Sequence, residues 1–266
     1  MLQHEGRTIG EVFSDAAARY ADKPFLIVPA DPARAYAGDG WQASYREVAG
    51  VVEELAGAFS AAGLGSGDRV AVLLENRPQM LILKLALASC GISWVPINPD
   101  YRAGEMAYVL ADCAAALAIV VGARAAVMRE AVELNGGACP VVVWDGEGMP
   151  LLPVIREAGP EASIEPESEA SLLYTSGTTG RPKGCIISHE YELMMGARYA
   201  SLGGVAQIGT ACERIYNPLP LFHVNAGIVL FYGMLLTGNA QVIPERFSRT
   251  RFWREVRETR STGIHY

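Results

Sequence analysis

The sequence predicts an α/β fold in which mostly parallel, layered sheets are flanked by helices. Short and continuously apolar segments, such as residues 70–74 and 117–121, alternate with longer amphipathic segments along the first half of the chain. Strands that are apolar on both faces are typical of parallel sheets with helices on both sides. The chain has 266 residues, half of them hydrophobic, and is therefore long enough to bury a substantial core.

The elements before residue 146 are predicted from capping signals and apolar runs. Thr8 with Glu11, and Ser44 with Glu47, have the spacing of a capping box, which marks the start of a helix. Pro78 suits the first turn of another helix, where its missing N–H does no harm. We expect strands at 25–28, 70–74, 94–97, 117–121 and 141–144, helices at 8–20, 44–62, 79–89, 102–113 and 123–134, and a loop at 31–40.

A segment rich in Pro, Glu and Gly, residues 146–169, is expected to be a linker. It divides the chain into a first α/β subdomain at 1–169, with the linker at its end, and the start of a second, incomplete subdomain at 170–266. In the second part, Ser188 and Ser248 are expected to cap helices. We further expect a strand near 210–216, a buried helix at 225–236, strands at 241–243 and from 263, and truncation of the chain at that last strand, without a C-terminal domain.

Composition argues against several functional classes. A net charge of −7 leaves no basic footprint for nucleic acid. Five scattered cysteines without C-x-x-C spacing indicate free thiols in a reducing compartment, which predicts a cytoplasmic protein. Cys185 is expected to be a small buried apolar side chain. Residues 215–244 carry no charged side chain, but Pro and Asn interrupt them, and the apolar core at 226–236 is too short for a membrane span.

The most specific local feature runs from Tyr174 to Gly184 and reads Tyr-Thr-Ser-Gly-Thr-Thr-Gly-Arg-Pro-Lys-Gly. Small residues let backbone N–H groups approach a ligand closely and Lys183 adds a positive charge, so the stretch predicts a polyphosphate-binding loop. It differs from a P-loop, because Pro182 replaces the second glycine and Gly184 replaces the Ser or Thr that holds Mg²⁺. A strand, not a helix, is expected after it at 185–187.

The same stretch, 174–184, resembles the signature phosphate loop of the adenylate-forming superfamily, which includes acyl- and aryl-CoA ligases, luciferases and adenylation domains of peptide synthetases. Residues 217–226, Asn-Pro-Leu-Pro-Leu-Phe-His-Val-Asn-Ala, resemble a second block of that family, Leu-Pro-x-Phe-His. Weaker similarity occurs at 44–48 and 95–99. The resemblance covers essentially the whole sequence but only the first half of the family's usual length.

The resemblance implies that ATP, with Mg²⁺, activates a carboxylic acid to an acyl-adenylate, and that CoA then accepts the acyl group as a thioester. It implies a catalytic role for Lys183 and a grip on the β- and γ-phosphates by Thr175, Ser176, Gly177, Thr178, Thr179, Gly180 and Lys183. Such a transfer depends on positioning and on neutralising the charge of the departing pyrophosphate more than on covalent help.

The resemblance also implies an acid pocket that contains Phe222, His223, Asn225, Gly227 and Tyr266. By analogy, His223 takes a catalytic role near the acid and the α-phosphate; from the residue types alone, a helix-entry histidine that satisfies a backbone carbonyl is the better explanation. For His189, a structural role at the start of a helix is at least as well supported as contact with the nucleotide. Asn225 is polar where many phenylpropenoid ligases carry an aromatic residue, which disfavours a coumarate-type acid. No metal ligands are assigned.

Two other functions stay open at this point: an adenylation domain that loads a carrier protein, and a non-catalytic, truncated nucleotide-binding module. The chain has no counterpart of the family's Tyr-Gly-x-Thr-Glu block, ribose-binding Asp, hinge or C-terminal catalytic Lys, so we expect it to be inactive or a poor catalyst by itself. The expected partners are a small carboxylic acid, ATP and CoA, without nucleic acid and without a membrane span, and a homo-oligomer is compatible with the sequence.

Overall fold

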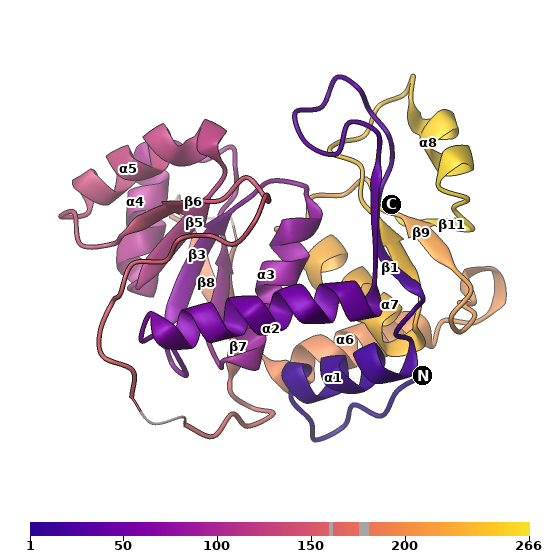
Figure 1. Cartoon of the computed structure of the whole chain (residues 1–266), viewed down its shortest axis with the longest axis horizontal. Coiled ribbons are helices and arrows are strands. Elements are labelled where there is room, and N and C mark those ends of the chain that lie inside the picture. Colours follow the sequence, from indigo (N-terminus) through magenta and orange to yellow (C-terminus); the bar gives the residue numbers. More distant parts are fainter. Residues whose placement is uncertain (160–161, 176–180) are drawn as a thin grey trace.

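Two sheets stand side by side, with one group of helices between them and further helices on their outer faces (Figure 1). The computed structural model describes residues 1–159, 162–175 and 181–266. Most neighbouring strands run parallel, and each sheet has one antiparallel pair. The predicted class, mostly parallel layered sheets flanked by helices, is confirmed.

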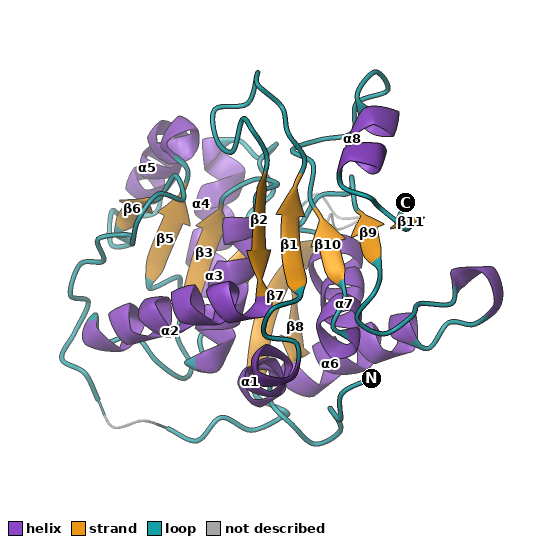
Figure 2. Cartoon of the chain, turned by 45° about the vertical axis from the view of Figure 1, so that its right-hand side comes forward, coloured by secondary structure: helices purple, strands orange, loops and turns teal. Residues whose placement is uncertain are grey.

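Sheet A has the strand order β11-β9-β10-β1-β2 (Figure 2). Its strands are β1 (Pro24–Val28), β2 (Trp41–Ser44), β9 (Arg214–Tyr216), β10 (Ala240–Val242) and β11 (Gly263–Ile264). Strand β2 runs antiparallel to β1 and forms one edge of the sheet. Strand β2 was not predicted, because a four-residue edge strand of which only Ala43 is buried carries almost no apolar signal.

Sheet B has the order β6-β5-β3-β4-β7-β8. Its strands are β3 (Arg69–Leu73), β4 (Ser93–Pro96), β5 (Leu117–Val120), β6 (Val141–Val143), β7 (Glu169–Thr175) and β8 (Lys183–Ser188). Strand β8 pairs antiparallel with β7 and forms the other edge, with Ile186 65% exposed. Cys185 on this strand is exposed. The expectation of a buried Cys185 was therefore wrong, because the first four residues of β8 are exposed and neither face of the strand is covered there.

The helices begin where the capping signals place them, with one exception. Thr8 and Ser44 each form the predicted capping box with Glu11 and Glu47. Ser248 does not cap a helix, because α8 starts four residues later and has Arg251 at its N-cap. The helices are α1 (Ile9–Arg19), α2 (Tyr45–Ala61), α3 (Pro78–Ser89), α4 (Ala103–Cys113), α5 (Ala125–Leu134), α6 (His189–Ala200), α7 (Phe231–Thr237) and α8 (Phe252–Glu258). Three short turns complete the set: η1 (Gly122–Arg124), η2 (Gly204–Ala206) and the π-helical η3 (Asn225–Leu230).

The main hydrophobic core lies between the sheets and contains residues of α1, α2, α3, α6 and α7 together with strands of both sheets. Helices α4 and α5 cover the outer face of sheet B (Figure 1). Helix α8 covers the outer face of sheet A, where Phe252 and Val256 pack against Ile27 and Tyr216. In the described part of the chain, no helix is both long and apolar enough to cross a membrane.

The predicted subdomain boundary at 169/170 does not separate the two sheets. Strand β7, from the second part, pairs with β4 at Trp94 and Ser171. Strand β10, also from the second part, pairs with β1 at Leu26 and Gln241. Each sheet is therefore completed only when both parts of the chain have come together.

Helix α3 carries one charged side chain, Lys84, and this residue is buried at the centre of the helical layer. Its Nζ atom lies 3.0 Å from a carboxylate oxygen of Glu192 on α6. It also lies 4.1 Å from the ring centroid of Trp94, and Ser171 of β7 donates a hydrogen bond to Glu192. Burial lowers the pKa of Lys84 and the neighbouring Glu192 opposes that shift.

Loss of Lys84 should strongly destabilise the fold. Lys84→Ala would leave the carboxylate of Glu192 buried without its cation, which typically costs about 3–5 kcal/mol. Urea unfolding at pH 7 measures the change. Arg46→Ala breaks the exposed pair with Asp22 and should leave the free energy of unfolding unchanged within error. A Lys84→Ala protein as stable as the wild type would show that the pair contributes nothing.

Candidate functional site

The predicted phosphate loop joins β7 to β8. Thr175 ends β7 and pairs directly with Lys183, which begins β8, and both residues are exposed. The strand after the loop agrees with the prediction that this is no P-loop. The other predicted phosphate ligands lie outside the described residues: Ser176, Gly177, Thr178, Thr179 and Gly180.

Both ends of the loop are tied to α4. The hydroxyl of Tyr174 donates a 2.6 Å hydrogen bond to Asp112, and the guanidinium of Arg181 lies 5.6 Å from the ring centroid of Tyr108. Burial, and next the bond to Asp112, raise the pKa of Tyr174, so its hydroxyl stays protonated and remains a donor. The frame that presents Thr175 and Lys183 is therefore anchored to the helix that covers sheet B.

The second block of the resemblance follows strand β9. Asn217 is buried, and its side-chain oxygen accepts the N–H of Leu219 at 3.2 Å. The side chain of Asn76, which lies shortly after β3, bonds both sides of Pro220: it donates to the Leu219 carbonyl at 3.1 Å and accepts the Leu221 N–H at 2.9 Å. Asn76 is not among the residues predicted from the sequence. A polar side chain just beyond a predicted parallel strand was the available signal.

The predicted pocket residues Phe222 and His223 lie together at the end of this segment, with ring centroids 4.3 Å apart. His223 is exposed, and partial desolvation lowers the pKa of its imidazole. The carbonyl of His223 accepts the N–H of Gly227 at 2.9 Å, which joins the segment to η3. Asn225, at the start of η3, is exposed.

Gly227 is buried and allows a close approach of backbone segments. A Cβ atom at this position would overlap the carbonyl oxygen of Leu221 and lie 3.4 Å from the Trp94 ring. The glycine is thus needed for the turn that carries Phe222 and His223, whatever else it contacts.

Tyr266 and His265 are arranged differently from each other. The side chain of Tyr266 is 94% exposed, whereas His265 is buried with its Nδ1 atom 3.1 Å from the hydroxyl of Tyr199. The backbone N–H of His265 donates to the Tyr216 carbonyl. In the described structure His265 therefore faces the interior, and Tyr266 does not.

His189 has a structural place. It is the first residue of α6, capped by Ser188 as predicted, and its Nδ1 atom accepts the N–H of Ile9 at 3.2 Å. Burial, and next the charge of Lys84, lower the pKa of His189 to about 4. A buried, neutral imidazole that accepts a backbone N–H explains the residue without a ligand.

The topology brings the two predicted blocks to one edge of the molecule. Strands β3, β4 and β7 run parallel, so Asn76, after β3, and Thr175, at the end of β7, lie at the carboxyl edge of sheet B. Asn76 fastens the segment that follows β9, at the carboxyl edge of sheet A. Ligand sites in open α/β sheets occur at such edges.

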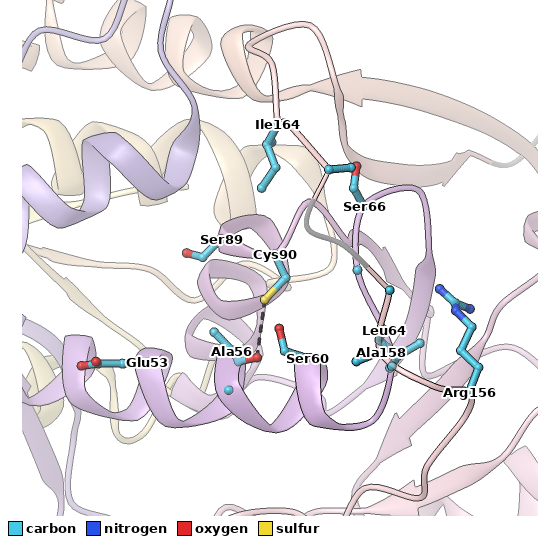
Figure 3. A pocket seen from close by; sticks show the side chains of 15 residues that line it. Glu53, Ala56, Ser60, Leu64, Ser66, Ser89, Cys90, Arg156, Ala158 and Ile164 are labelled. Atoms are coloured by element: carbon cyan, nitrogen blue, oxygen red, sulfur yellow. Dashed lines mark hydrogen bonds between the residues drawn. The ribbon is translucent and has the colours of Figure 1, made fainter.

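Two cavities of the described structure lie elsewhere. One, of about 640 Å³, is lined by the ends of α2 and α3 and by linker residues, with Cys90 Sγ 3.7 Å from the Ala56 carbonyl (Figure 3). The other, of about 930 Å³, lies along β6 and the linker. Neither is lined by a predicted site residue. Across the described ranges, no three His, Cys, Asp or Glu side chains are grouped to hold a metal ion.

Residues 13–266 match the family described as AMP-binding enzyme. A sulfoacetate–CoA ligase from Cupriavidus necator is 32% identical over 251 residues, which cover 93% of this chain and 47% of the relative. A crotonobetaine/carnitine–CoA ligase from Salmonella paratyphi B is 27% identical over 97% of this chain and 50% of the relative. The crystal structure of a long-chain-fatty-acid-CoA ligase (FadD1) from Archaeoglobus fulgidus shares the fold, with a TM-score of 0.80 at 22% identity over 98% of this chain and 51% of that one. The chain spans about half the length of the curated relatives it matches.

Gly227→Ala should disrupt the turn before η3. The new methyl group meets backbone, which cannot move aside as a side chain can, so we expect a loss of about 1–3 kcal/mol or more. Thermal unfolding measures it. Gly50→Ala is the matched control, because this exposed glycine in α2 has open space around it and alanine favours a helix. Equal midpoints for the two variants would contradict the close approach.

Stability should fall on acidification because of His189. Its pKa is about 4 in the folded state against 6.5 ordinarily, so the unfolded chain binds the proton more readily and folding stability is lost as pH falls from about 6.5 toward 4. Between pH 7 and pH 5 we expect this group to remove about 2 kcal/mol. His189→Gln keeps an acceptor but cannot titrate, so urea unfolding at both pH values should show a smaller fall. An identical fall in the variant would refute the assignment.

Proposed function

The chain belongs to the AMP-binding enzyme family, and from that premise we propose that its protein is an ATP-dependent acid–CoA ligase. The enzyme joins a carboxylic acid to AMP with release of pyrophosphate and then passes the acyl group to CoA. The observation that carries this proposal is that Thr175 and Lys183, at the two ends of the β7–β8 loop, and the segment before Phe222 and His223 lie at the carboxyl edges of the two sheets. The named ligases among the relatives support the same reaction class.

The chemistry requires that the negative charge of the departing pyrophosphate be neutralised. A carboxylate is a poor electrophile until its oxygen is bonded to the α-phosphorus of ATP, and pyrophosphate then leaves with a large negative charge. Lys183 is exposed opposite Thr175, where it can approach the β- and γ-phosphates. The hydroxyl of Thr175 and the ammonium of Lys183 are donors that stabilise such a leaving group when they are held in place. ATP enters with Mg²⁺, and Lys183 is assigned to the phosphates that depart.

His223 is proposed to lie beside the acid and the α-phosphate. Its lowered pKa keeps the imidazole neutral at pH 7, so it can accept or donate one hydrogen bond without adding a full charge next to the carboxylate. Phe222 and Gly227 shape the backbone and apolar surface around it. Tyr266 is assigned to the outer part of the acid pocket, consistent with its exposure.

We assign a non-aromatic acid as the substrate class. Asn225 presents an exposed amide at the start of η3, where an aromatic acid would need an apolar neighbour. Two of the relatives are named for small acids, sulfoacetate and crotonobetaine or carnitine. Pyrophosphate release by the full-length protein across sulfoacetate, crotonobetaine, octanoate and coumarate, with and without CoA, tests both statements. Release with none of these acids would overturn the ligase proposal, and release with coumarate alone would overturn the substrate class.

Lys183→Ala in the full-length protein should raise the KM for ATP far more than the KM for the acid, because the side chain is assigned to the departing phosphates. The expected loss in kcat/KM for ATP is about 100-fold, the size seen when one preorganised donor is removed. Lys23→Ala, another exposed lysine, should leave both constants unchanged. An equal loss for ATP and acid would remove Lys183 from the phosphate site.

A further inference from the structure

We propose that Asn76 is a positioning residue for the acid site, and that Tyr36 in turn holds Asn76 in place. This inference rests on the proposed function, because it concerns the segment that carries Phe222 and His223. Asn76 contacts that segment through its side-chain amide, not through His223 itself. Its role is to fix where the histidine stands.

The segment needs such a support because its own backbone is poor in donors. Pro218 and Pro220 have no N–H and cannot join a strand ladder. Asn76 supplies both a donor, to the Leu219 carbonyl, and an acceptor, for the Leu221 N–H, so one amide brackets Pro220 from both sides. An asparagine can do this because its side chain carries a carbonyl oxygen and an NH₂ group together. Neither Ala nor Asp offers both.

The backbone of Asn76 is held by the loop that connects β1 to β2. The hydroxyl of Tyr36 donates a 2.7 Å hydrogen bond to the backbone carbonyl of Asn76. Two guanidinium groups lie over the ring of Tyr36, with Arg34 4.8 Å and Arg77 4.3 Å from its centroid. Guanidinium groups stack well on aromatic faces, so the ring has little freedom to turn.

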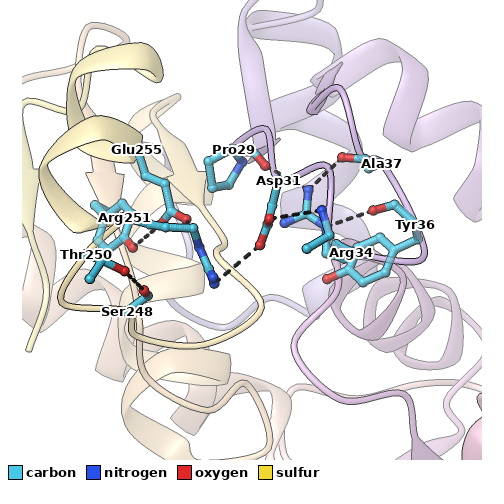
Figure 4. Close-up of polar contacts among 11 residues, drawn as sticks. Pro29, Asp31, Arg34, Tyr36, Ala37, Ser248, Thr250, Arg251 and Glu255 are labelled. Carbon is cyan, nitrogen blue, oxygen red and sulfur yellow. Dashed lines mark hydrogen bonds and ion pairs between the residues drawn. The ribbon is translucent and has the colours of Figure 1, made fainter.

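The same loop is anchored to α8 at its other end (Figure 4). The buried Arg34 donates to three backbone carbonyls of the loop: Pro29, Tyr36 and Ala37. Asp31 lies 3.3 Å from Arg251, which also pairs with the buried Glu255 at 3.1 Å. A continuous set of polar contacts therefore runs from α8 through the loop at 31–38 to Asn76 and on to the segment before His223.

These contacts distinguish positioning from general stabilisation. Asn217 already pairs with Val242 through its backbone N–H, so β9 and β10 are joined without Asn76. Asn76 in addition fixes the backbone course of residues 219–221, and this course sets the position from which Phe222 and His223 continue. Misplacement of a reacting group by about 1 Å can cost about 100-fold in rate, so a bracket of this kind has a measurable kinetic effect.

The test combines kinetics of the full-length protein with titration of His223. Asn76→Ala should lower kcat for acid-dependent pyrophosphate release about 10- to 100-fold and change the KM for ATP less than about threefold. In a His223→Ala background the same substitution should have almost no further effect, because both act through one group. Asn135→Ala, at the C-cap of α5, is the matched control and should be silent in both backgrounds.

An activity-independent measurement decides whether His223 moves. The imidazole resonance of His223, assigned by its loss in His223→Gln, should titrate at a higher pH in Asn76→Ala than in the wild type, because a displaced segment exposes the ring. Tyr36→Phe keeps the stacked ring and removes only the hydroxyl, so it should shift both readouts in the same direction by a smaller amount. If Asn76→Ala fails to fold, Tyr36→Phe still tests the positioning role.

The outcomes separate this inference from the proposed function. A kinetic loss that adds fully to that of His223→Ala, or a His223 titration unchanged in both Asn76→Ala and Tyr36→Phe, overturns the positioning role. If none of the tested acids supports pyrophosphate release by the wild-type protein, the ligase proposal fails. The titration of His223 by itself then decides whether Asn76 sets the position of His223.

Discussion

A helix that is apolar on every side needs protein all around it, and α3 imposes that condition on this fold. It packs against β3 and β4 of one sheet and β1 of the other, with α1 and α2 beside it. The two sheets must therefore stand on either side of one helical layer. The charge of Lys84 within that layer is tolerated because Glu192 and the face of Trp94 surround it.

This arrangement places the carboxyl edges of the two sheets next to each other. The corner after β3 and the segment after β9 are separated by more than a hundred residues in the chain, yet one asparagine amide joins them. The phosphate loop leaves β7 at the same edge of sheet B. The groups proposed for the phosphates and those proposed for the acid thus come to these edges from distant parts of the chain, as is general for sites at the carboxyl ends of parallel strands.

Burial sets the protonation of several groups in this fold. Desolvation lowers the pKa of His189 and His223 and raises that of Tyr174, so near neutral pH the two imidazoles are uncharged and the phenol keeps its proton. Each then serves as a hydrogen-bond partner without a net charge. The exposed Lys183 begins an edge strand and pairs with Thr175.

The sequence by itself determined the local features: both capping boxes, the alternation of strands and helices, and the two motifs around Lys183 and His223. These depend on residues close together in the chain. Only the tertiary structure decided which sheet each strand joins, that Cys185 is exposed on an edge, and that Asn76 supports the segment before His223. Such pairings depend on packing between distant segments, and a short edge strand like β2 or a single amide leaves no periodic pattern in the sequence. The physical reason is that long-range contacts are selected by the burial of shared surfaces, which local spacing does not encode.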